Sequence, residues 1–382
     1  MRGVPLAWLR LNYEKRRFFA AVAGITFAVV LMLMQLGLRE VLYRASMRIP
    51  DHLAGELVMI NPQYEFLYAL KSFSQRRLYS ALASDSVNTV VPIYLQMGTW
   101  KDPSTLREHT ISVIGAPANR QVLDLPALGS EIPKIGVPDT VLFDVGSRPE
   151  FGPIAEMYAR GAGLYTEVND RRVKVVGLFD LGATFGAGGH LLTSDVNFSR
   201  LFNRPLGLID LGLIQLKPHA DPAKALRDLS SRLPDDVVVL TRADFAEQEA
   251  DYWAKRAAIG FIFDLGAAMG LIVGAVIVYQ ILYTDVVDHL DEYATLKAIG
   301  YRDRYLYSVV LQESVILSLL GFVPGYAIAE LLYLVARQNA HVPVEMSVAR
   351  AVGVFLLTVG MCMTSGSIAM RKLTYADPAE IF

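Results

Sequence analysis

The chain has 382 residues, of which 53% are hydrophobic and only 19% are charged. Soluble domains carry about 25% charged residues, so this composition argues against a disordered chain and against an ordinary cytosolic enzyme. The formal net charge of −2 leaves no basic excess for nucleic-acid phosphates. The single cysteine, Cys362, excludes an intrachain disulfide and any cysteine-based metal cluster.

Long apolar runs lie near both ends of the chain. They cover residues 18–38, 265–283, 305–336 and 351–370, and the second predicted span extends over 257–284. A membrane-spanning helix needs about 20 apolar residues, and each run is long enough. We therefore predict four transmembrane helices, with buried core helices as the alternative. The third run contains Glu313 and Glu330. An acidic side chain inside a membrane needs a hydrogen-bonding or charged partner, or a position that faces water.

Basic residues flank the first and last runs: Arg10, Lys15, Arg16, Arg17, Arg371 and Lys372. Positive residues favour the cytoplasmic side, so we predict an inner-membrane protein with both termini in the cytoplasm. The loop 285–304 and the tail 371–382 are then cytoplasmic as well. The segment 39–256 and the short loop 337–350 are predicted to lie on the periplasmic side.

The segment 39–256 has the pattern of a folded α+β domain. Short stretches rich in β-branched residues alternate with turn residues; they cover 56–60, 89–97, 110–114, 140–145, 172–179, 211–216 and 237–240. Helical patterns cover 64–82, 194–201 and 222–233, the last with Asp221 as N-cap and Pro222 as its first residue. We expect two lobes, with a break near 115–139.

No stretch of the sequence carries a catalytic pattern. The glycine-rich stretch 179–189 is followed by His190, where a phosphate-binding loop requires lysine, so a flexible turn is the simpler interpretation. Histidine spacings typical of zinc sites and the serine nucleophile elbow are absent from the sequence. We therefore expect no enzymatic activity, no metal and no cofactor in this chain.

The stretch 283–301 is amphipathic when wound as a helix. One arc carries Val286, Val287, Leu290, Tyr293, Ala294 and Lys297, and the other carries Asp285, Asp288, Asp291 and Glu292. The acidic residues come early in this helix and the lysine comes late, as the helix dipole favours. Gly300 lies where glycine commonly ends a helix. Two interpretations remain open, a solvated loop helix and a lever that docks in a groove of a cytoplasmic partner.

The N-terminal residues 1–17 contain a second amphipathic stretch. Leu6, Leu9 and Tyr13 lie on one side of a helix, and Arg10 and Arg17 lie opposite. This pattern is typical of a helix lying in the membrane interface. A plain cytoplasmic extension of the first span explains it equally well.

The motifs of the cytoplasmic loop resemble those of the ABC transporter permeases MacB, LolC, LolE and FtsX. In that family a glutamate in the loop after the second span is followed eight residues later by glycine; Glu292, Ala298 and Gly300 stand at matching positions. Asp291 and Leu296 replace residues that are often basic in the family. The N-terminal PLAWLRL and the loop motif EYATLKAIGY are similar to the DevC branch, and Glu313, Gly321–Gly325 and the tail 376–380 also match.

The resemblance implies a MacB-like, type VII ABC permease fold that forms a homodimer. It implies two copies of a separate ATPase subunit, which would bind the ATP and magnesium. The implied ATPase-coupling residues are Asp285, Asp288, Asp291, Glu292, Lys297, Ala298 and Gly300, and Glu313 is the implied polar residue inside the membrane.

Family behaviour further implies mechanotransmission to a periplasmic, DevB-like adaptor and an outer-membrane channel. The cargo would be a lipid, a glycolipid or another hydrophobic molecule. An FtsX-like regulator of a cell-wall hydrolase, a LolC-like lipoprotein extractor and a membrane-bound sensor remain alternatives.

Overall fold

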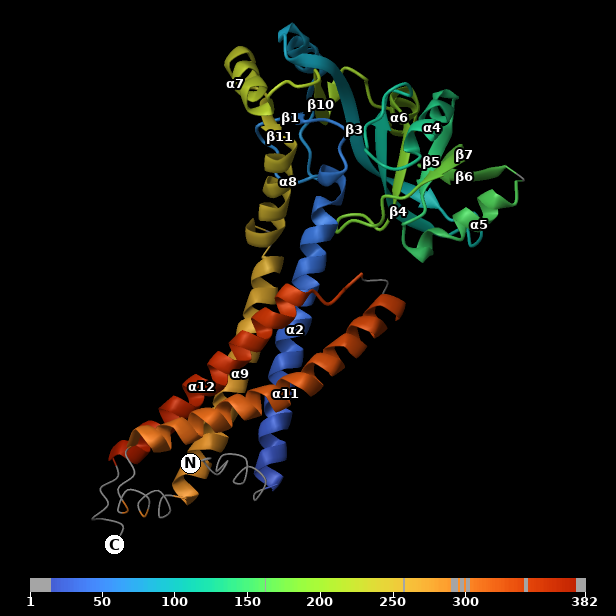
Figure 1. The fold of residues 1–382 in the computed structure, drawn as a ribbon. Helices are drawn as coiled ribbons and strands as arrows, with labels where there is room; N and C mark the ends of the chain where they lie inside the picture. The colour runs from blue at the N-terminus through green and yellow to red at the C-terminus, as the bar shows by residue number, and fades with distance from the viewer. Residues whose placement is uncertain are drawn as a thin grey trace. The chain divides into compact units, whose positions relative to one another are not determined.

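The computed structural model describes residues 15–161, 163–256, 258–289, 303–339 and 343–375, together with Thr295 and Ile299. The chain divides into two compact units (Figure 1). We call Met1–Val41 with Ala258–Phe382 the helical unit, and Leu42–Ala257 the α/β unit.

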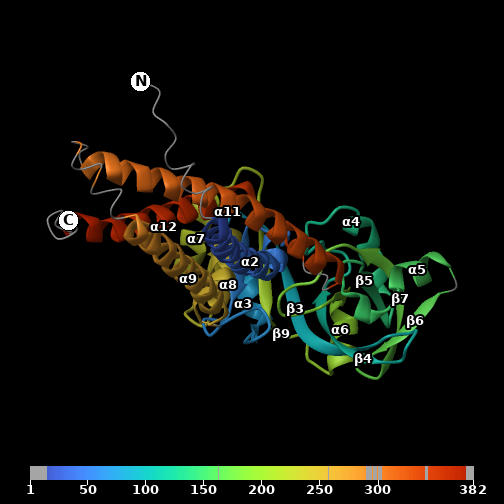
Figure 2. The same ribbon diagram turned by 90° about the horizontal axis from the view of Figure 1, so that it is seen from below.

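The helical unit consists of long apolar helices. They are α2 (Lys15–Asp51), α9 (Ile259–Asp288), α11 (Asp303–Asn339) and α12 (Val348–Tyr375). Each is long and apolar enough to cross a membrane, and each carries one of the four predicted apolar runs. Helix α12 lies beside both α9 and α11 (Figures 1 and 2). Helix α2 continues past Val41, so its last residues belong to the α/β unit.

Glycines allow the other helices to approach α2 closely. A Cβ atom added at Gly270 or Gly274 of α9 would lie against Ala28 or its neighbours in α2. A Cβ added at Gly325 of α11 would lie 2.7 Å from a methyl group of Val29, also in α2. Apolar surface gains little by leaving lipid, so close van der Waals contact between small residues stabilises such interfaces.

The α/β unit is built on one nine-stranded sheet, with strand order β11-β1-β10-β3-β4-β8-β5-β7-β6. The strands are β1 (Leu57–Ile60), β3 (Val87–Lys101), β4 (Glu108–Ala116), β5 (Thr140–Asp144), β6 (Leu164–Val168), β7 (Arg171–Phe179), β8 (His190–Ser194), β10 (Leu211–Leu216) and β11 (Val238–Thr241). A separate pair comprises β2 (Phe73–Ser74) and β9 (Leu208–Ile209).

Short helices connect the strands. They are α3 (Gln75–Ser80), η1 (Ala81–Ala83), α4 (Leu128–Glu131), η2 (Ile132–Gly136), η3 (Pro149–Phe151), α5 (Ile154–Ala159), α6 (Asp195–Phe202), α7 (Pro222–Arg232), α8 (Arg242–Asp251) and the π-helical η4 (Tyr252–Arg256). The predicted cap of α7 is confirmed, because the Asp221 side chain accepts a hydrogen bond from the backbone N–H of Ala223 at 2.9 Å.

The long strand β3 joins the two halves of the sheet. Its first half pairs with β10, and its second half pairs with β4. Its end also pairs with β6, so the strands from β3 to β6 close into a barrel-like ring. Trp100 is fully buried in this half and donates its indole N–H to the carbonyl of Phe151 at 3.0 Å.

Two sequence-based expectations for this unit are corrected. The segment 115–139 does not divide two lobes; it connects β4 to β5, which lie in the same closed half of the sheet. The helix predicted over 64–82 is confined to α3 and η1. The backbone N–H of Leu67 instead donates to the buried carboxylate of Glu249, at 3.0 Å, so a tertiary contact overrides the local helical pattern.

Candidate functional site

The predicted ATPase-coupling segment is described only at its start. Asp285 and Asp288 lie in the last turn of α9. The remaining predicted coupling residues, which are Asp291, Glu292, Lys297, Ala298 and Gly300, lie outside the described residues. So does the predicted N-terminal amphipathic stretch up to residue 14, while its last residues, Lys15–Arg17, begin α2.

The described part of this segment corrects one expectation. Asp285 and Asp288 were expected early in a separate helix, but α9 runs on through Asp288, so both lie at its C-terminal end. A carboxylate is unfavourable there, because the helix dipole places partial negative charge at that end. Arg17 offsets this unfavourable interaction, because its guanidinium lies 2.5 Å from the Asp288 carboxylate.

A second ion pair joins α2 and α9 at the opposite end of their contact. The Arg39 guanidinium pairs with the Asp264 carboxylate. Both pairs are partly exposed, and such pairs contribute only about 0–1 kcal/mol each in water. Together with the glycine contacts between them, they hold α2 and α9 as one antiparallel helix pair.

Glu313 lies in α11 and is buried. Its neighbour Ser314 is also buried and donates to the carbonyl of Val310, one turn back in α11, at 2.8 Å. The predicted polar position inside the third span is therefore a buried position in the described bundle. An ionisable residue at membrane depth marks a candidate functional position.

A charged cluster at the other end of the bundle was missed by the sequence analysis. Arg350 of α12 is almost fully buried and lies 2.5 Å from the Glu40 carboxylate of α2. Its guanidinium also donates to the hydroxyl of Tyr333 in α11, at 2.9 Å, and that hydroxyl bonds to the carbonyl of Leu33 in α2. Three helices thus meet at one ion pair. The available signal was a pair of opposite charges just after the first apolar run and just before the fourth.

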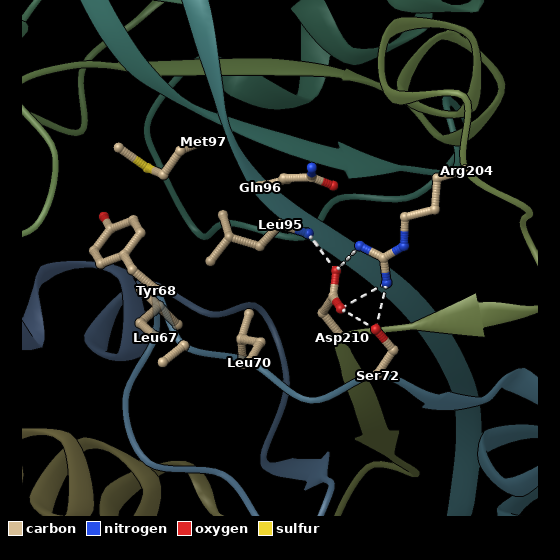
Figure 3. Close-up of a pocket in the computed structure, with 10 residues that line it drawn as sticks. Leu67, Tyr68, Leu70, Ser72, Leu95, Gln96, Met97, Arg204 and Asp210 are labelled. Atoms are coloured by element: carbon tan, nitrogen blue, oxygen red, sulfur yellow. Dashed lines mark hydrogen bonds and ion pairs between the residues drawn. The ribbon is translucent and has the colours of Figure 1, made fainter.

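The α/β unit holds a small pocket, shown in Figure 3, of about 320 Å³. Arg204 forms its polar side, pairing with both oxygens of Asp210 at 2.7 Å and donating to Ser72 at 2.8 Å. Leu67 and Leu95 belong to the apolar side. The volume lies at the low end of the range for small-molecule sites. Because Asp210 already neutralises Arg204, the pocket offers an amphipathic surface rather than an unpaired charge.

The glycine-rich stretch forms the connection between β7 and β8 and closes over buried polar groups. The carboxylate of Asp144 accepts the backbone N–H groups of Leu181 and Gly182 at 2.9 and 3.0 Å. Burial raises the pKa of Asp144 above its ordinary value.

Within the described ranges, no group of three or more His, Cys, Asp or Glu side chains could hold a metal ion.

The C-terminal helices of the helical unit match a known family. Residues 265–378 match the model of the FtsX-like permease C-terminal family, which covers most of α9 and all of α11 and α12. The C-terminal part of this chain is therefore similar to the FtsX-like permeases over these residues. This match and the four helices long and apolar enough to cross a membrane, found among the described residues, support a membrane protein.

Two solved structures are similar to part of the chain at low scores. The periplasmic region of MacB from Actinobacillus actinomycetemcomitans is 10% identical, with a TM-score of 0.37, and the match covers 52% of this chain and 94% of that one. The extracellular domain of the noncanonic ABC-type transporter YknZ from Gram-positive bacteria is 14% identical, with a TM-score of 0.32, covering 49% and 98%. Scores this low do not establish a common fold. No curated protein matches the sequence.

Proposed function

We propose that this chain is the permease subunit of an ABC transporter and that a separate subunit supplies the ATPase activity. The observation that carries the proposal is the FtsX-like permease match over residues 265–378, which includes the whole loop from 285 to 304. In the sequence, this loop carries the amphipathic pattern and the Glu292–Gly300 spacing that resemble an ATPase-coupling element.

The proposed mechanism is mechanical transmission through the pair of helices α2 and α9. The ion pairs Arg17–Asp288 and Arg39–Asp264 tie the two helices together at both ends of their contact. Helix α2 runs unbroken from Lys15 to Asp51 and so enters the α/β unit as a continuous helix. ATP-driven closure of the partner ATPases would displace the loop after α9, and the paired helices would carry that displacement to the α/β unit.

The rest of the assembly follows the same proposal. The permease is a homodimer in the inner membrane, with both termini in the cytoplasm and two ATPase subunits that bind ATP and magnesium. A periplasmic DevB-like adaptor and an outer-membrane channel complete a tripartite exporter of a lipid, a glycolipid or another hydrophobic cargo.

Two substitutions in the loop test the coupling. Glu292→Lys reverses a charge that would face the partner, and charges at an interface set register and specificity. Gly300→Val removes the freedom to adopt positive φ, which strains a sharp turn by about 1–3 kcal/mol. We expect both variants to insert and dimerise normally but to lower the stimulation of the partner ATPase by the permease several-fold.

The matched controls lie away from the loop. Glu150→Lys reverses an exposed charge in the α/β unit, and Gly353→Val adds a side chain where nothing lies within 4 Å. Both controls should leave ATPase stimulation unchanged. Normal stimulation by the Glu292 and Gly300 variants would contradict the coupling role. Co-purification of a cell-wall hydrolase in place of an adaptor would favour the FtsX-like regulator.

A further inference from the structure

The loop between β7 and β8 packs against the first and the last helical segments of the α/β unit. Arg48, near the end of α2, donates a hydrogen bond to the carbonyl of Leu181 at 3.1 Å. Phe185, farther along the loop, lies edge-on to Trp253 in η4, with ring centroids 4.5 Å apart. Both contacts lie inside the α/β unit, with Arg48 near its first residue, Leu42, and Trp253 near its last, Ala257.

Trp253 lies close to the membrane along the chain. It precedes Ile259, the first residue of α9, by fewer than two helical turns. That stretch spans about 9 Å if helical and about 20 Å if fully extended. The headgroup layer on each side of a bilayer is about 5–8 Å deep. The surface beside Trp253 is thus within reach of the lipid headgroups.

Phe185 is the exposed member of a fixed aromatic cluster, which comprises Phe66, Phe185, Tyr252 and Trp253. Phe66 stacks on Tyr252 with centroids 4.4 Å apart and meets Trp253 edge-on. The indole N–H of Trp253 donates to the carboxylate of Glu249 at 2.9 Å, so the ring is held from inside the unit. Burial raises the pKa of Glu249 above its ordinary value. The Phe185 side chain remains 40% exposed.

The chemistry of this surface fits lipid. Aromatic side chains concentrate at the boundary between water and hydrocarbon, where an apolar ring can lie beside polar groups. Lys255 and Arg256 lie two and three residues after Trp253 and are exposed; Lys255 pairs with Asp251 at 2.8 Å, and basic side chains at this place suit a phosphate-bearing surface. The glycines around Phe185 let the backbone turn tightly; Gly182, for example, has φ +85°. A loop of this kind presents its one large apolar ring outward.

We propose that the tip of this loop, residues 183–187 with Phe185 at its centre, inserts into the lipid interface on the side of the membrane that holds the α/β unit. The proposal rests on the four membrane-spanning helices and not on the transport function. It assigns the glycine-rich stretch a role as a lipid-contacting loop, which moves with the α/β unit because Phe185 packs on Trp253.

A single nitroxide label tests the proposal in the full-length protein. Phe185→Cys in a Cys362→Ser background is labelled and reconstituted in nanodiscs of phosphatidylethanolamine and phosphatidylglycerol. The accessibility of the label to oxygen, which partitions into lipid, is compared with its accessibility to a water-soluble nickel complex. The controls are Val196→Cys on α6 and Ile272→Cys on α9, both at side chains that are 55% exposed.

We expect the oxygen-to-nickel ratio at position 185 to exceed that at position 196 several-fold and to approach that at position 272. A ratio equal to that at position 196 would place the loop in water and overturn the proposal. Protection from both reagents would indicate contact with protein, either a second copy or another subunit, and would also overturn it.

A second variant keeps the test valid if the cysteine disturbs the loop. Phe185→Trp preserves an aromatic ring against Trp253. Its added fluorescence should be quenched by lipids brominated near the glycerol backbone, beyond the quenching of the unmodified protein. No added quenching in a correctly folded variant would count against insertion.

Discussion

His190 is a histidine whose pKa lies far below its ordinary value. It begins β8, it is fully buried, and neither ring nitrogen has a hydrogen-bond partner among the described residues. Burial, and secondarily the nearby Arg48 charge, lower its pKa to about 3. The imidazole is therefore neutral in the folded protein over the physiological range.

This depressed pKa predicts a loss of stability in mild acid. An unfolded histidine titrates near pH 6.5, so below that pH the unfolded chain binds a proton that the folded chain does not. The folded state should lose about 1.4 kcal/mol per pH unit as pH falls from about 6.5 towards 3. Thermal unfolding of the full-length protein in detergent should show this loss between pH 7 and pH 5.

The variant His190→Gln isolates this residue. Glutamine is polar but does not titrate in this range, so the pH dependence of its unfolding should be shallower than that of the wild type by about 2 kcal/mol between pH 7 and pH 5. An equal pH dependence in the two proteins would show that His190 is not the group that titrates.

At the scale of elements, the packing of α11 on α2 depends on glycine. A leucine at Gly325 would force its Cβ against Val29 and the carbonyl of Thr26, at 2.7 and 3.1 Å. Overpacking of this kind costs about 1–3 kcal/mol. We expect Gly325→Leu to lower the thermal midpoint of the detergent-solubilised protein, measured by the loss of the monodisperse peak in size-exclusion chromatography.

Gly360 of α12 provides the matched control. It is also a glycine in a membrane-spanning helix, but nothing lies within 4 Å of its added Cβ. Gly360→Leu should therefore leave the midpoint unchanged. If both leucines destabilise the protein equally, helix propensity or lipid contact, and not the α2 interface, governs the effect.

The elements differ in how well their sequence predicts them. Apolar runs long enough to span a bilayer have few alternatives, so all four helices lie where the sequence places them. Strands such as β7, with alternating apolar residues, were also predicted closely. Strand β8 was missed because His190 and the glycines before it read as a turn. The closure of β3 on β6 depends on pairing between residues far apart in the chain, which local patterns do not encode.

In the candidate site, too, local sequence patterns predict some features, while contacts between distant residues determine others. The local pattern placed Asp288 early in a helix, whereas α9 continues through it, and its pairing with Arg17 joins residues far apart in the sequence. The cluster of Glu40, Tyr333 and Arg350 likewise assembles residues from three helices. Its opposite charges were visible in the sequence, but only tertiary packing brings them together.

At the scale of the whole molecule, the predicted topology places the α/β unit outside the inner membrane. Asp170→Cys and Val196→Cys introduce thiols at exposed positions of this unit, in a background where the buried Cys362 is replaced by serine. Both should react with an impermeant maleimide in cells whose outer membrane alone has been opened. Lys15→Cys, at the start of α2, should react only after the inner membrane is lysed. The reverse pattern would contradict the predicted orientation.

We propose above that this chain is a permease whose ATPase lies in another subunit. The most direct measurement is ATP hydrolysis by the purified protein in nanodiscs, alone and after assembly with its cognate ATPase. We expect no hydrolysis by the chain alone, and hydrolysis by the assembled complex that falls several-fold when Glu292→Lys is introduced into the permease. Hydrolysis by the contaminant-free chain alone, or failure of any ATPase subunit to bind it, would contradict the account.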